Sequence, residues 1–250
     1  DWLTQQGIEQ SVVWLCTPMA LPLAQALDPL CLVYDCMDEL SAFKDAPRPM
    51  WQREIALMRQ AALVVCAGPS LYEVRRRLNP NTHCMPNSVD AVHFSSQRLD
   101  PISEPGCVVH ALQRDWHGPK LGFFGVIDER LDIALVAQVA DAHPDWHIVM
   151  VGPVVKIDTT KLLQRTNIHW LGLQPYARLP HFLAAWDVCL MPYVLNESTR
   201  FSSPAETLEY MAGGKPVVST AVNDVMAMYG AAVEIAHTPA AFVRACEQLL

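Results

Sequence analysis

The sequence lacks a long apolar run, an excess of positive charge and any CxxC pair of cysteines. Because a membrane-spanning helix needs about 20 consecutive apolar residues, none is expected. The 18 lysines and arginines against 26 acidic residues give a net charge of −8. This excludes a general nucleic-acid binder, since nonspecific affinity for phosphates needs clustered cations. The eight cysteines stand mostly inside apolar runs. They predict reduced core thiols of a cytoplasmic protein, and neither disulfides nor a zinc site.

What the sequence does contain is a regular alternation of short apolar strands with amphipathic or polar segments. This alternation predicts parallel sheets with helices on both faces, and 250 residues suffice for two compact α/β domains. The expected strands are residues 11–16, 30–36, 62–67, 82–86, 120–125, 147–152, 168–171, 187–193, 216–220 and 232–235. The expected helices are residues 21–27, 49–60, 70–77, 131–142, 179–185, 203–212 and 240–249.

Residues 95–118 interrupt this alternation, because they contain prolines and glycines and show no clear period. We interpret them as a linker between two doubly wound domains, residues 1–112 and 113–250. A strand follows the first residue, Asp1, almost at once. We therefore expect a first domain that is truncated at its N-terminus.

The most informative segment, residues 203–220, is typical of a loop, a helix, a turn and a buried strand in succession. Ser203 can cap the helix with Glu206 as its capping-box partner, and Pro204 suits the first helical position. The amides and positive dipole end of such a helix would attract an anion. Glu209, expected about a turn and a half inside, would then be near a sugar attached to a bound phosphate. If the segment is taken alone, a plain capping box and a solvated glutamate are the better explanation, because capping boxes are common.

Other strand ends carry residues suited to the same ligand. Residues 121–132 run from a buried strand through a turn at Gly125, where a phosphate could approach the backbone, to Arg130, which could pair with a diphosphate. A tight turn with a surface arginine is the simpler interpretation of this segment alone. The strand at 187–193 leads into a polar loop containing Asn196, which feeds the helix. Because ligands bind at the carboxyl ends of strands in such sheets, this convergence favours an anion site.

Four motifs occur in an order that resembles the GT-B glycosyltransferases of family 4, especially the bacterial enzymes that build polysaccharides. These motifs are residues 34–39, 86–90, 125–132 and 208–218. The resemblance implies two Rossmann-like domains facing each other across a cleft. It also implies that the second domain holds a nucleotide-diphosphate sugar of the UDP or GDP type, with no metal and no other cofactor.

The resemblance also implies roles for single residues. Glu209 matches the glutamate that binds the ribose, Ser203 and Pro204 fall near the diphosphate, and Arg130 falls where these enzymes place a cation that pairs with a phosphate. In the first half, Asp38 matches an aspartate that acts as general base or orients the acceptor hydroxyl, with Asp35 in reserve. The simpler alternative is that these two acids cap a helix.

The sequence departs from the family pattern at three positions. Phe201 stands where the family often has the first of two acidic residues eight positions apart, and Asn196 or Glu197 could replace that contact. Glu206 stands where similar helices usually carry a lysine that contacts a phosphate. Ser88 replaces a glycine in a turn.

The sequence therefore predicts a retaining, metal-independent glycosyltransferase that uses a nucleotide-sugar donor and a glycan or lipid-linked acceptor. A nucleotide-sugar 2-epimerase of the same fold, or a non-catalytic remnant that only binds the nucleotide sugar, are the alternatives. The basic run 75–77 could also contact an anionic membrane surface at the inner face of the membrane, although a solvated helix end is the default interpretation.

Overall fold

The computed structural model describes residues 2–95, 103–162 and 164–250, and the chain divides into two compact units. The first unit runs to Asn87 and also includes Arg200–Ser203. The second unit comprises Ser88–Thr199 and Pro204–Leu250. No helix in the described part of the chain has the length and apolar character needed to cross a membrane.

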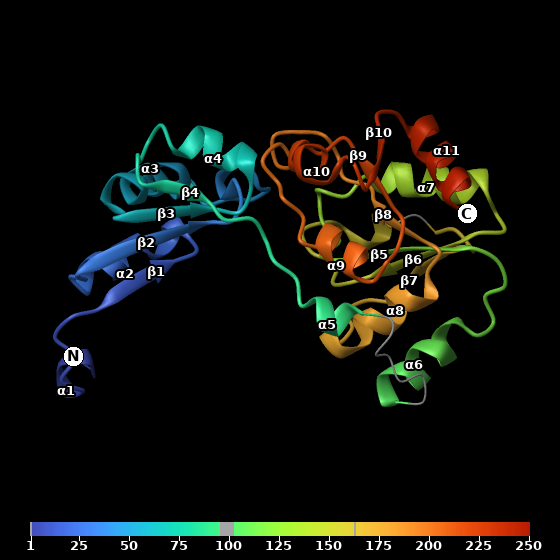
Figure 1. Cartoon of the computed structure of the whole chain (residues 1–250), viewed down its shortest axis with the longest axis horizontal. Helices are drawn as coiled ribbons and strands as arrows, with labels where there is room; N and C mark the ends of the chain where they lie inside the picture. Colours follow the sequence, from blue (N-terminus) through green and yellow to red (C-terminus); the bar gives the residue numbers. More distant parts are fainter. Residues whose placement is uncertain (1, 96–102, 163) are drawn as a thin grey trace. The chain divides into compact units, whose positions relative to one another are not determined.

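The first unit is a parallel four-stranded sheet with strand order β1-β2-β3-β4 (Figure 1). Its elements are α1 (Trp2–Gln5), β1 (Val12–Leu15), α2 (Leu21–Ala26), β2 (Cys31–Cys36), α3 (Met50–Gln60), β3 (Leu63–Cys66), α4 (Pro69–Arg75) and β4 (Thr82–Cys84). One face of β2 and β3, with Leu32, Tyr34 and Val64, packs against Leu57 and Met58 of α3. The strands form here because their β-branched residues suit a half-buried pleated surface.

A buried ionic network joins α3 and α4 of the first unit. The guanidinium of Arg75 is 1% exposed, and its Nη2 donates to Glu39 Oε2 at 2.6 Å and to Glu54 at 3.1 Å. The hydroxyl of Tyr34 donates to Glu54 at 2.8 Å. Arg76 pairs with Glu73 on the surface. Arg75 therefore belongs to the interior, and the expectation that it contacts a membrane surface is wrong for this residue.

The second unit is a parallel six-stranded sheet with strand order β10-β9-β8-β5-β6-β7. Its strands are β5 (Lys120–Phe124), β6 (His147–Val151), β7 (Ile168–Trp170), β8 (Val188–Met191), β9 (Val217–Thr220) and β10 (Glu234–Ala236). The chain moves outward from β5 to β7 and then returns to the other side of β5 with β8. This is the strand order of a Rossmann fold, and it places the topological switch point between β5 and β8.

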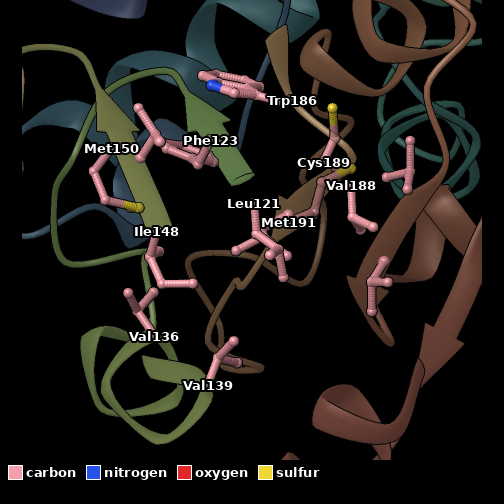
Figure 2. Packing of buried hydrophobic residues seen from close by; sticks show 14 of the residues in the cluster. Leu121, Phe123, Val136, Val139, Ile148, Met150, Trp186, Val188, Cys189 and Met191 are labelled. Atoms are coloured by element: carbon pink, nitrogen blue, oxygen red, sulfur yellow. The ribbon is translucent and has the colours of Figure 1, made fainter. Parts of the chain in front are cut away.

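Helices cover this sheet on both faces, as expected for an all-parallel sheet (Figure 1). They are α5 (Ala91–Phe94), α6 (Glu104–Gln113), α7 (Ile133–Ala142), α8 (Leu179–Ala185), α9 (Glu206–Ala212), α10 (Asn223–Tyr229) and α11 (Pro239–Leu249). α7 packs with α11, whereas α8 packs with α5 and α6. Figure 2 shows the core between them, where Leu121 and Phe123 of β5 lie near Ile148, Val188 and Trp186.

The glycine at position 122 explains how the largest of these side chains fits. A Cβ atom at Gly122 would overlap with the indole ring of Trp186, so the absence of a side chain on β5 lets the ring pack directly on the strand. Trp186 is 1% exposed and lies 5.7 Å from the ring of Phe124, between centroids. The core of the second unit therefore depends on one small residue in its central strand.

All ten expected strands are confirmed, each within two residues of its expected ends. The division between the units lies nearer the N-terminus than residue 112, because Phe94 and Val109 belong to the core of the second unit. Residues 96–102 of the expected linker lie outside the described residues. Residues 104–113 form α6, so the expectation of a linker is wrong there. The helix is capped by Ser103, whose hydroxyl accepts from the amide of Gly106 at 3.4 Å.

Candidate functional site

The loop after β5 is built from two glycines that bring their backbones into contact. Gly125 has φ of +150° and its N–H donates to Val151 O at 3.0 Å. Gly152, which follows β6 with φ of +144°, has no room for a Cβ, because that atom would overlap with the carbonyl oxygen of Gly125. This stacking fixes the Gly125 loop at the carboxyl end of β5, beside the switch point.

Helix α9 is anchored to this strand end by Tyr210, which is fully buried. Its hydroxyl accepts from the N–H of Phe124 at 3.0 Å and donates to the carbonyl of Phe124 at 3.3 Å. Thr207, also on α9, donates its hydroxyl to the sulfur of Met191 at the end of β8 at 3.3 Å. Burial raises the pKa of Tyr210, so the hydroxyl stays protonated and keeps both bonds. The helix is therefore held over the carboxyl ends of β5 and β8.

Two carboxylates in the first turn of α9 lie at this site. Outside the chain neighbours of Gly125, Glu206 Oε1 is the atom nearest to the point where a Cβ on that glycine would stand, at 2.7 Å. Burial, and then the neighbouring charge of Glu206, raise the pKa of Glu209 to about 7. Burial, Glu209 and Asp90 together raise the pKa of Tyr176, which places Tyr176 in the electrostatic surroundings of Glu209. The site thus combines a glycine loop with a half-buried carboxyl group whose proton is readily gained or lost near neutral pH.

Arg130 also lies beside the switch point, but its guanidinium is held by a buried acid. Its Nε donates to Asp128 Oδ1 at 3.0 Å and its Nη2 to Asp128 Oδ2 at 2.9 Å, and Asp128 is 5% exposed. The carbonyl of Arg130 accepts from the N–H of Val194 at 2.9 Å, which ties this loop to the segment after β8. The positive charge at Arg130 is therefore partly offset by Asp128 before any ligand binds.

The expected helix start differs from the observed one. α9 begins at Glu206 with Ala205 as its N-cap and has no side-chain cap, so the capping box of Ser203 and Glu206 is wrong. The carbonyl of Ser203 accepts from the amide of Asn87 at 2.7 Å, and both residues belong to the first unit. Pro204 is buried and starts the turn that leads into the helix, with its carbonyl accepting from Thr207 at 3.3 Å. Glu209 consequently lies in the first turn and not a turn and a half inside.

Asn196 organises its own loop. Its Oδ1 accepts from the amide of Ser198 at 2.9 Å and from the hydroxyl of Ser198 at 2.7 Å. Its N–H donates to the hydroxyl of Thr199 at 3.2 Å. This arrangement shapes the loop after β8, and it commits the amide oxygen of Asn196 to that loop.

The two candidate acids of the first unit lie at the end of the buried strand β2: Asp35 is its last residue but one, and Asp38 follows it. The carboxylate of Asp35 accepts from Trp14 Nε1 at 3.2 Å, in an exposed contact with the edge strand β1. Asp38 accepts from the hydroxyl of Ser202 at 3.4 Å, and Ser202 belongs to the same unit. Phe201, next to Ser202, packs against the core of this unit. Both acids are therefore partly exposed at the carboxyl end of β2, where an acid could meet a substrate.

A cavity of about 490 Å³ lies elsewhere in the second unit. It is lined by residues of α6 and α8 together with Lys120, the first residue of β5. This is the amino end of β5, opposite to the end at which open α/β sheets bind ligands. Across the described ranges 2–95, 103–162 and 164–250, no group of three or more His, Cys, Asp or Glu side chains is placed to hold a metal ion.

Several residues of this site were not predicted. Tyr210, Tyr176 and Asp128 carry no signal in the sequence beyond their place near strand ends, since their roles depend on long-range packing. Gly152 could have been found, because it follows a buried strand as Gly125 does. Helix α9, which carries Glu209, lies at the ends of β5 and β8, and the carbonyl of Arg130 is bonded to the segment after β8; the roles of Gly125, Glu209 and Arg130 stay predictions.

The comparisons with known proteins agree with this geometry. Residues 118–250, more than half of the chain, match the family model described as Glycosyl transferases group 1. TuaH of Bacillus subtilis strain 168, a teichuronic acid biosynthesis glycosyltransferase by provisional assignment, is 27% identical over 241 residues. That match covers 88% of this chain and 58% of TuaH, so the chain spans less than two thirds of this relative.

Two solved structures show the same fold. HepE from Anabaena, in complex with UDP and glucose, is 18% identical with a TM-score of 0.74, over 98% of this chain and 69% of HepE. Sucrose-phosphate synthase from Thermosynechococcus elongatus is 15% identical with a TM-score of 0.76, over 99% of this chain and 66% of that chain. The expected fold class, α/β of the GT-B type, is therefore confirmed. The chain belongs to the Glycosyl transferases group 1 family.

Proposed function

We propose that the chain acts as a glycosyltransferase that moves a sugar from a nucleotide-diphosphate donor to a glycan or lipid-linked acceptor. The observation that carries this proposal is the position of Glu209. Its half-buried carboxyl group lies on a helix anchored to the switch point, beside the Gly125 loop. A carboxylate there can accept hydrogen bonds from ribose hydroxyls while the glycine lets a phosphate approach the backbone.

The relatives favour a UDP-type donor. HepE has been crystallised with UDP and with UDP-glucose. The shared fold covers almost the whole length of the present chain. TuaH is named for teichuronic acid biosynthesis, which supports a glycan or lipid-linked acceptor. We propose retention of configuration and independence of metal as properties of the family, and a GDP-type donor as the second possibility.

Different residues would act on the donor and on the acceptor. Glu209 would hold the ribose, and Gly125 would admit the diphosphate. Arg130, kept rigid by Asp128, would add positive charge near the departing phosphates. Asp38, with Asp35 in reserve, would accept the proton of the acceptor hydroxyl or orient it.

The test is a panel of UDP- and GDP-sugars, with binding measured by calorimetry and turnover by release of nucleotide. We expect one donor to bind and to release free sugar and nucleotide slowly, since water can replace the acceptor. Glu209→Ala should weaken this binding about tenfold to a hundredfold, through loss of charge-assisted hydrogen bonds, and should leave the fold intact. Glu234→Ala, which removes an exposed carboxylate of the same unit on β10, is the matched control.

The outcomes also separate the alternatives. Interconversion of sugar epimers would indicate a nucleotide-sugar 2-epimerase, and binding without any turnover would indicate a remnant that only holds the nucleotide sugar. Unchanged affinity in Glu209→Ala would remove Glu209 from the donor site.

A further inference from the structure

The structure places a carboxylate of the chain itself against the loop that the donor needs. We propose that Glu206 occupies the space beside Gly125 that a donor phosphate would take, so that Glu206 competes with the donor and determines its affinity. This inference rests on the proposed function and goes beyond it, because it assigns a negative role to a residue inside the site.

The geometry gives the first argument. Of the heavy atoms around the Cβ position of Gly125, outside its chain neighbours, Glu206 Oε1 is the nearest at 2.7 Å, followed by the ring of Phe123 at 2.9 Å. Because Gly125 has no Cβ, another group can approach its backbone where a side chain would stand. In this structure that group is the carboxylate of Glu206. A phosphate oxygen carries the same charge and similar size, so the two groups cannot share the space.

The rigidity of the surroundings gives the second argument. Gly125 cannot move away from Glu206, since its carbonyl stacks on Gly152 and its N–H is bonded to Val151. The backbone of α9 cannot move either, since Tyr210 is bonded to both backbone groups of Phe124. A donor phosphate must therefore displace the side chain of Glu206, which is only partly buried.

The charge balance of the site gives the third argument. Glu209 lies one turn further along α9, and the charge of Glu206 raises its pKa after burial has done so. Arg130 is engaged by Asp128 at distances of 2.9 and 3.0 Å. Removing the charge of Glu206 should therefore favour an incoming diphosphate more strongly than a nucleoside, which would gain only from the easier ionisation of Glu209.

The experiment compares nucleotides with their nucleosides on three forms of the whole chain. Calorimetry would measure UDP against uridine, and GDP against guanosine, on the wild type, Glu206→Gln and Glu206→Lys. We expect Glu206→Gln to bind the diphosphate about tenfold more tightly, and Glu206→Lys more tightly still, with a smaller gain for the nucleoside. Glu234→Gln removes the same charge from an exposed position on β10 and should bind as the wild type does.

Each outcome bears on a different claim. Equal or weaker diphosphate binding by both Glu206 variants would overturn the competition and leave the proposed function standing. An equal gain for nucleoside and diphosphate would also overturn it, since the effect would then not concern the phosphate. If no form binds any nucleotide or nucleotide sugar, the proposed function itself fails, and this inference with it.

Discussion

At the scale of single residues, Glu209 is a carboxyl group in a costly place. Burial removes it from water and Glu206 lies one turn away, so both influences favour its protonated form. Ionised Glu209 therefore lowers the stability of the fold. We interpret this loss of stability as the consequence of keeping a hydrogen-bond acceptor available to the hydroxyl groups of a ligand, since functional sites often retain residues that lower stability.

The raised pKa of Glu209 leads to a prediction about the pH dependence of stability. The pKa of Glu209 rises from 4.5 to about 7 in the folded chain, so between these values the folded state holds a proton that the unfolded state has released. The free energy of unfolding should therefore fall as pH rises through this window. Glu209→Gln should be more stable than the wild type at pH 8, by about 1 kcal/mol once solvent screening is discounted, and equally stable near pH 4.5. Thermal unfolding at a series of pH values measures the difference.

Glu234→Gln is the control for this series, because its exposed carboxylate has no such environment. A difference between Glu209→Gln and the wild type that is constant across the pH range would show that the carboxyl group of Glu209 titrates as in water.

Tyr210 gives a second prediction at this scale. Tyr210→Phe would leave the buried N–H of Phe124 without its acceptor at the centre of the sheet. We expect a loss of about 1–3 kcal/mol in the free energy of unfolding, measured by urea denaturation. Tyr176→Phe, at a tyrosine that is 52% exposed, should change it by less than about 0.5 kcal/mol. Equal losses in both variants would contradict the role of Tyr210 as the anchor of α9.

At the scale of elements, the strands were predictable because each is a short apolar run, such as Val217 and Val218 of β9, that only a parallel sheet can bury. The start of α9 was not predicted correctly. Ser203 and Pro204 have the composition of a helix start, but the carbonyl of Ser203 accepts from Asn87, also of the first unit, and the helix begins only at Glu206, with Ala205 as its N-cap. The sequence did not predict α6 either, because its proline and glycine are unfavourable inside a helix. Burial of Val109 stabilises the helix in the structure.

The candidate site shows the same limit. The strand order that follows from alternation brings Gly125 and Glu209 to one edge, and the sequence sufficed for that. It could not show that Asp128 engages Arg130, or that Glu206 contacts Gly125 in place of capping the helix, because both contacts depend on how the loops fold back.

The ionic network of the first unit gives a prediction about how elements are joined. Arg75→Met would leave Glu39 and Glu54 buried without their cation. We expect a loss of about 3–5 kcal/mol in the free energy of unfolding, measured by urea denaturation. The same substitution two residues away, Arg77→Met, lies on the exposed side of α4's end and should have little effect. A double variant, Arg75→Met with Glu54→Gln, should recover part of the loss; no recovery would mean that packing, and not charge, explains it.

At the scale of the whole molecule, the candidate residues are divided between the two units. Glu209, Gly125 and Arg130 belong to the second unit, whereas Asp35 and Asp38 belong to the first. If the proposed function is right, substitutions in the two units should have separable effects, because donor binding requires only the first group of residues and transfer requires both.

The last prediction uses this separation. Asp38→Asn keeps the shape of the side chain and its contact with Ser202 but removes the proton acceptor. Donor affinity measured by calorimetry should stay within about twofold of the wild type, while the rate of sugar release to water should fall roughly a hundredfold, as expected for loss of a general base. Asp35→Asn is the matched control, since Asp35 lies near the end of the same strand but accepts from Trp14. A full rate in Asp38→Asn with a lost rate in Asp35→Asn would transfer the role to Asp35. Loss of donor affinity in Asp38→Asn would contradict the division of roles between the units.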